Sequence, residues 1–149
     1  MRKRTHAREA ALQILYQHEM NPAPAREIMD LYWDHNEPVP EDVKAFAEQL
    51  VRGTLEHAQE LDQVIKKAAQ NWDLGRMAVI DRNILRFAVY ELLFLEDVPP
   101  KVTINEAVNI AKRFSQEESG KFVNGVLDHI NHTEKPRYSA SHEPEKKAE

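Results

Sequence analysis

The sequence predicts an all-α protein, and three observations support this prediction. Ten of the sixteen residues at 80–95 are aliphatic or Phe, and neither Gly nor Pro interrupts them. No segment alternates Val, Ile or Thr with polar residues as strands do, and the chain has only four Gly. Segments with two prolines each at 21–24, 37–40 and 98–100 separate apolar patterns of helical spacing. We therefore expect about seven helices joined by short links.

The first half of the chain is expected to hold four helices. Thr5 is placed to cap the first of them, and Pro40 suits the first turn of the third. Their expected bounds are about 5–20, 25–35, 41–55 and 61–72, with a break near 57–60. Trp72 closes the apolar stripe of the fourth helix.

The helix at 80–95 is expected to be central, because it is apolar around most of its circumference. Such a helix is stable only when other helices cover it. Thr103 and Glu106 form a capping box for the next helix, with Val102 and Ala107 at the staple positions. After a polar link at 115–119, the last helix contains Gly125, which costs about 1 kcal/mol and predicts close approach of another helix.

The totals favour one soluble domain at 1–132, followed by a disordered charged tail at 133–149. The chain lacks Cys, which fits a reducing cytoplasm and excludes disulfides and Cys-ligated zinc. No apolar stretch reaches the roughly 18 residues of a membrane span, and no signal-peptide core is present at the N-terminus. We expect a cytoplasmic protein.

Charge is distributed unevenly along the chain. The net charge of −5 disfavours nucleic-acid binding, yet the first eight residues carry four basic side chains and no acid. These are Arg2, Lys3, Arg4 and Arg8. A basic arm on an acidic body is typical of proteins that grip phosphate locally. The alternative is a solvated, unstructured N-terminus.

The sequence contains no convincing catalytic or metal-binding pattern. His129 and His132 lie three residues apart with Glu134 beyond, but no second cluster supports a metal site, and a cation at a helix end explains them. The sequence has no GxSxG, GxxxxGK[ST] or GxGxxG motif. Glu91, among apolar neighbours, is expected to be a buried carboxylate paired with an Arg or capping a helix. The sequence predicts no enzyme and no cofactor.

Two aromatic residues could serve single-stranded RNA, which proteins recognise by stacking rings on bases. Gln13 and Tyr16 follow the basic arm on the first helix. Positions 12, 13 and 16 lie close to Arg8 around the helix surface, so Tyr16 is placed to present its ring beside the basic end. Phe122 lies beside Lys121. For both aromatic residues, a place in the core is the alternative.

Four segments resemble the NusB family of bacterial transcription antitermination factors. They are ARxxALQxLY at 7–16, DRNILRFAVYEL at 81–92, VPxKVxINEAVxxAK at 98–112 and KFVNGVLD at 121–128. The segments stand in the family's order and spacing, and the resemblance extends from about residue 4 to residue 130. The resemblance implies two packed three-helix bundles, no catalysis, and a heterodimer with the ribosomal protein NusE. That heterodimer would bind the boxA element of nascent ribosomal RNA and act on the elongating RNA polymerase.

The resemblance also implies the site residues. Those expected to bind RNA are Arg2, Lys3, Arg4, Arg8, Gln13, Tyr16, Glu118, Lys121 and Phe122. Those expected to face the protein partner, near the central helix, are Arg76, Asp81 and Arg82. Two alternatives stay open: a protein-binding helical adaptor or homodimer, and a module associated with a ribosomal RNA methyltransferase.

Overall fold

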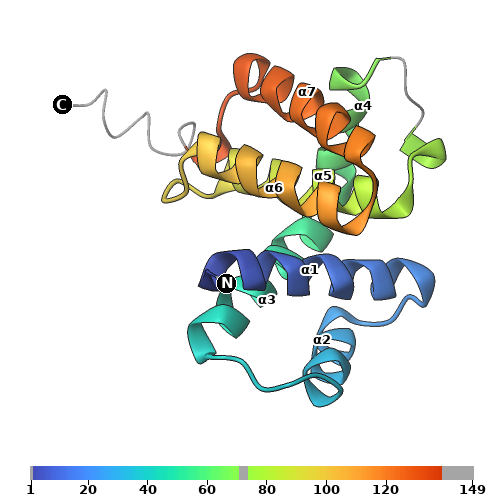
Figure 1. The fold of residues 1–149 in the computed structure, drawn as a ribbon, viewed down its shortest axis with the longest axis vertical. Coiled ribbons are helices and arrows are strands. Elements are labelled where there is room, and N and C mark those ends of the chain that lie inside the picture. The colour runs from blue at the N-terminus through green and yellow to red at the C-terminus, as the bar shows by residue number, and fades with distance from the viewer. Residues whose placement is uncertain (1, 71–73, 139–149) are drawn as a thin grey trace.

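The structure, a computed structural model, describes residues 2–70 and 74–138. Within these ranges it contains seven α-helices, one short 3₁₀ helix and no strand. The helices are α1 (Lys3–Met20), α2 (Ala25–Asp34), α3 (Glu41–Glu56), α4 (Ala58–Ala68), α5 (Val79–Phe94), α6 (Pro100–Phe114) and α7 (Glu117–Thr133), with the 3₁₀ helix η1 (Leu74–Arg76) before α5. Helices α1–α3 form one group and α4–α7 the other (Figure 1). The predicted all-α fold is confirmed.

Helix α5 is the centre of the molecule. It packs against α1, α3, α4, α6 and α7, so both groups cover it. Ile84, Leu85 and Phe87 are fully buried, as are Ala88 and Val89 on the following turn. At roughly 1.5–3 kcal/mol for each large apolar side chain buried, this helix supplies much of the core. The predicted central helix is confirmed.

The links between helices lie close to where prolines and polar residues predicted them. Helix α1 ends at Met20, just before Pro22, and α3 begins at Glu41 directly after Pro40. His57 separates α3 from α4, inside the predicted break. The link before α7 is shorter than expected, because α7 already begins at Glu117. Trp72 lies outside the described residues.

Both side-chain caps predicted from sequence are wrong. Helix α1 begins at Lys3, two residues before Thr5, and α6 begins at Pro100, three residues before Thr103. The Thr5 hydroxyl donates to Glu106 on α6, and the Thr103 hydroxyl donates to Glu91 on α5 at 2.8 Å. Val102, expected at a staple position, is exposed. The Thr and Glu side chains bond across helices instead of capping their own.

Arg8 is the centre of this buried network. Its Nε and Nη2 donate to the two carboxylate oxygens of Glu91, each at 2.8 Å, and Nη1 lies 3.3 Å from Glu106 Oε1. The predicted Arg partner of Glu91 is therefore Arg8. Burial opposes the charge of Arg8, but the bonds to Glu91 and Glu106 outweigh burial and raise the pKa of the guanidinium. The network ties α1 to α5 and α6.

The close approach of another helix expected at Gly125 is wrong. Gly125 is exposed, and a Cβ built there would meet nothing within 4 Å, so none of the described helices packs tightly against it. The close contact occurs at Gly53, where a Cβ would collide with the ring of Tyr90 on α5. The tail expected at 133–149 begins within the described residues: Thr133 is the last residue of α7, and Arg137 Nε donates to Glu60 on α4 at 2.6 Å. Residues 139–149 lie outside the described part of the chain.

Candidate nucleic-acid interface

Three cations gather at the first turn of α1. Arg2, Lys3 and Arg4 are exposed, and the chain is helical from Lys3 onward, so this segment is not an unstructured arm. Lys3 Nζ lies 3.0 Å from Asp42 and lowers the pKa of that carboxyl. Arg4 Nη2 lies 3.4 Å from Asp97 Oδ2, and the Arg4 guanidinium lies over the ring of Phe46. Exposed ion pairs contribute little stability, so these cations can exchange their carboxylates for phosphates.

Arg8 does not belong with these cations, contrary to the expectation from sequence. Its side chain is 2% exposed and is bonded to Glu91 and Glu106. Turning it outward to a phosphate would leave the buried Glu91 carboxylate without its cation, at a cost of several kcal/mol. The four basic residues of the N-terminus thus divide into three at the surface and one in the core.

One exposed face of α1 runs from Arg2 to the C-terminal end of the helix. Gln13 and Tyr16 both lie on this face, and Tyr16 is 39% exposed. Tyr16 follows Arg2 by fourteen positions, which is nearly four turns, so the two side chains leave the helix within about 40° of each other. The alternative of a core position for Tyr16 is wrong. Lys3 and Arg4, one and two positions after Arg2, leave the helix about 140° and 120° from Tyr16, so among the three cations it is Arg2 that shares the face of Tyr16.

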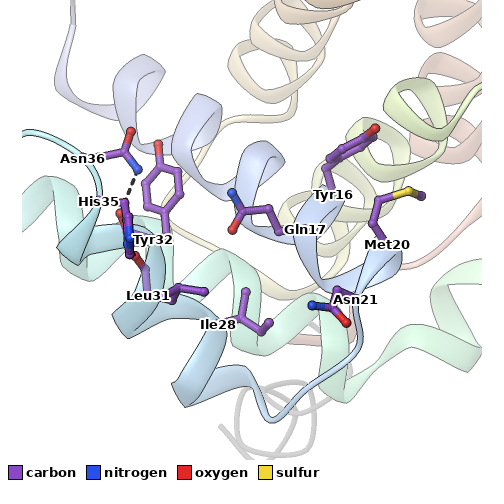
Figure 2. A pocket seen from close by; sticks show the side chains of 9 residues that line it. All are labelled: Tyr16, Gln17, Met20, Asn21, Ile28, Leu31, Tyr32, His35 and Asn36. Carbon is purple, nitrogen blue, oxygen red and sulfur yellow. Dashed lines mark hydrogen bonds between the residues drawn. The ribbon is translucent and has the colours of Figure 1, made fainter.

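A groove of about 460 Å³ lies between this face and α2 (Figure 2). Tyr16 and Met20 form one end of it, and Tyr32, His35 and Asn36 the other (Figure 2). Ile28 and Leu31 of α2 complete its apolar wall, and Leu31 and Met20 are about half exposed. The sequence gives no sign of this groove, because Leu31 continues the apolar pattern of a helix in which Ile28, Met29 and Tyr32 are buried.

The second part of the predicted site is the start of α7. Glu118 and Lys121 are exposed there, and Phe122 is partly exposed. Phe122 and Glu118 line a cavity of about 240 Å³ together with Asp81 of α5. Asp81 is 8% exposed, and its Oδ2 accepts a hydrogen bond from Ser119 at 2.9 Å. Its Oδ1 has no hydrogen-bond partner among the described residues.

Ion pairs connect α1 to the end of α6 and to the start of α5. Arg113, in the last turn of α6, pairs with Glu9 on α1, which places the α6–α7 link against the middle of α1. Glu19, near the end of α1, accepts hydrogen bonds from Arg82, Asn83 and Arg86 of α5. Burial opposes ionisation of Glu19, but the bonds from Arg82 and Asn83 outweigh burial and lower its pKa. The α1 face and the start of α7 therefore border one surface.

The residues expected at the protein partner do not form one patch. Arg76 is exposed in η1, whereas Arg82 is held by Glu19 and by the carbonyl oxygen of Met77. Asp81 faces the cavity that it shares with Glu118 and Phe122, on the side expected to bind RNA. The structure groups Asp81 with the RNA-side residues more closely than with Arg76.

Residues 2–70 and 74–138 contain no group of three or more His, Asp or Glu side chains that could hold a metal ion. His132 Nδ1 bonds to the carbonyl oxygen of Asp128 in its own helix, at 2.7 Å. No described helix combines the length and apolar character needed to span a membrane.

Known proteins resemble this chain in sequence and in fold. A model of the NusB family matches residues 5–132. The transcription antitermination protein NusB of Thermodesulfovibrio yellowstonii is 47% identical over 137 residues, covering 86% of this chain and 91% of the relative. The protein of the same name from Geobacter sulfurreducens is 48% identical over 130 residues, covering 87% and 94%.

Two solved structures share the fold. T. maritima NusB superposes with a TM-score of 0.82 at 39% identity, covering 93% of this chain and 96% of that one. A crystal structure of the antitermination factors NusB and NusE in complex with dsRNA gives a TM-score of 0.81 at 31% identity, covering 89% and 98%. On the family match and these identities, the chain belongs to the NusB family.

Proposed function

We propose that this protein is a transcription antitermination factor that binds the boxA element of nascent ribosomal RNA as a heterodimer with NusE. The observation that carries the proposal is the surface bordered by the cations of α1, Tyr16 and the start of α7. Cations bind phosphates without regard to sequence, and exposed rings stack on unpaired bases. The relatives named for antitermination, and the related complex with NusE and RNA, support the same function.

The protein's task would be to position RNA, with no bond made or broken. Arg2, Lys3 and Arg4 would hold the backbone, while Tyr16 and Phe122 would stack on splayed bases. Asp81 and Glu118 would accept hydrogen bonds from base amino groups and repel misplaced phosphates. NusE would complete the surface presented to the elongating polymerase in the cytoplasm.

Titration of RNA against the purified protein tests this function. A boxA-like single strand and a scrambled strand of equal length would be compared, each with and without NusE. We expect tighter binding of the boxA-like strand, with NusE strengthening it further. Equal binding of both strands in the presence of NusE would contradict a boxA-specific factor.

The groove between α1 and α2 favours a second candidate, a protein-binding adaptor or a homodimer. Its exposed Met20 and Leu31 are residue types that often mark a protein contact. Sedimentation equilibrium, with and without RNA, separates the two functions. A dimer that dissociates when RNA is added would show that both use the same surface, whereas a dimer indifferent to RNA would favour the adaptor.

A further inference from the structure

A cavity of about 450 Å³ lies beside the N-terminal half of α1, where the α2–α3 link passes it. Its wall contains Gln13, Tyr32, Trp33 and Asn36, with His6 toward the cationic end of α1. Tyr32 and Asn36 also line the apolar groove of Figure 2, so groove and cavity adjoin along α1. The volume falls within the roughly 300–1,000 Å³ of small-molecule sites.

A buried hydroxyl orients the side chain of Gln13. Tyr32 is 7% exposed, and its hydroxyl donates to Gln13 Oε1 at 3.1 Å. Burial raises the pKa of Tyr32, which keeps the proton on this donor. Because the oxygen of the Gln13 amide is engaged, its Nε2 is the end that can donate to a molecule in the cavity.

Asn36 has the opposite arrangement. Its Nδ2 donates to the carbonyl oxygen of Tyr32 at 2.7 Å, so its Oδ1 is the end that can accept. One donor and one acceptor match the edge of a nucleobase, which offers both, and do not match a phosphate, which only accepts. Glu37 on the exposed wall also disfavours a phosphate, whereas the Glu9 carboxylate is paired with Arg113.

We propose that this cavity binds one base of a single-stranded RNA. Gln13 and Asn36 touch the edge of the base, and Tyr32 is a positioning residue that fixes the Gln13 amide. The inference rests on the RNA binding proposed above and adds a place where a base is read. In this arrangement the phosphates lie at the cations of the first turn of α1. His6, which lines the cavity, follows Arg2 by one helical turn, so the cavity adjoins these cations.

The test uses full-length protein, NusE and the boxA-like strand, with affinity measured by fluorescence titration. Tyr32→Phe removes only the hydroxyl and should weaken binding about three- to tenfold, the value of one hydrogen bond. Gln13→Glu removes the donor from an exposed position and should weaken binding at least as much. Gln49→Glu, on the exposed side of α3, adds the same charge outside the cavity and serves as control. Tyr90→Phe controls for the loss of a buried tyrosine hydroxyl.

A double-mutant cycle separates positioning from structural support. In the Gln13→Ala background, Tyr32→Phe should leave RNA affinity unchanged, because no amide remains to be oriented. An equal loss in both backgrounds would overturn the positioning role. If the wild-type protein binds RNA while Gln13→Glu binds equally well, the base site is wrong and the RNA function stands, even should Tyr32→Phe fail to fold. A wild-type protein that binds no RNA would overturn both.

Discussion

Arg4 and Arg8 belong to the same basic run, lie one helical turn apart, and have opposite fates. Both guanidinium groups lie over the ring of Phe46, 4.2 Å and 5.4 Å from its centroid. Arg4 remains exposed and pairs with Asp97 at the surface, whereas Arg8 is buried against Glu91 and Glu106. One cation is free to exchange partners, and the other fastens three helices together. A run of like charges therefore need not have one role.

The comparison also separates two energy scales. An exposed pair such as that of Arg4 contributes about 0–1 kcal/mol, because water and salt screen it. A buried pair contributes little compared with apolar residues of the same shape, yet removing one member costs about 3–5 kcal/mol. Four variants test the difference between groups at the surface and groups held by other helices, from the largest expected effect to the smallest.

Replacing Arg8 by Ala should destabilise the protein by about 3–5 kcal/mol, because Glu91 would be left buried and unpaired. Urea unfolding followed by circular dichroism measures this change. Arg4→Ala is the matched control, with an expected loss below about 1 kcal/mol. Replacing Arg8 by Met together with Glu91 by Leu should recover most of the stability. Equal losses for Arg4→Ala and Arg8→Ala would refute the division of roles.

Replacing Arg2, Lys3 and Arg4 together by Ala should weaken RNA binding while leaving helicity intact. Three phosphate contacts to a single strand predict a log–log salt slope of about −2, which the triple variant should bring toward zero. Titrations at several salt concentrations give the slope. An unchanged slope would remove these cations from the interface.

Tyr16→Ala should cost about 1–3 kcal/mol of RNA affinity if the exposed ring stacks on a base. Its thermal stability should change little, since the ring lies at the surface. Calorimetry and RNA titration of the same sample distinguish the two effects. Tyr90→Ala is the contrasting case, because that ring is buried and should lower stability without a specific effect on RNA. Loss of stability in Tyr16→Ala without loss of affinity would place the ring in the core.

Glu19 offers the smallest effect and a pH dependence. Its pKa is lower in the folded protein than the usual 4.5, so folding favours its ionised form. The stability that it contributes is therefore present above pH 4.5 and is lost as pH falls through the lower, folded pKa. Glu19→Gln should flatten the acid limb of the unfolding free energy. An acid limb identical to that of the wild type would show that Glu19 is not coupled to Arg82.

Much of the fold could be predicted from sequence because helix formation is largely local. Apolar spacing and prolines gave the number of helices, and the breaks at His57 and Pro40 agree with the structure. The burial of Glu91 was also predicted, with an Arg partner as one of two alternatives and a helix cap as the other, since a buried carboxylate needs a partner. The basic arm, Tyr16 and Phe122 were singled out from the residues themselves and Glu118 from the resemblance, and their contacts with RNA remain predictions.

The failed cap predictions share one cause. Thr5, Thr103 and Glu106 have spacings that suit caps, yet each bonds to another helix. A partner on a distant helix can satisfy the hydrogen-bonding capacity of a hydroxyl or carboxylate as well as a neighbouring backbone amide can. Sequence spacing indicates only the neighbouring amide. The groove beside Tyr16 was missed because it lies between α1 and α2, so the residue pattern of neither helix alone indicates it.

The sequence by itself determined that this chain is helical, where its helices break and that one of them is central. Those properties depend on propensities and periodicities that extend over a few turns. Only the tertiary structure decided which basic residue of the N-terminus is buried and which side chains share the surface of α1. The physical reason is that burial and partnership depend on packing between helices far apart in the chain, as between Arg8 and Glu91.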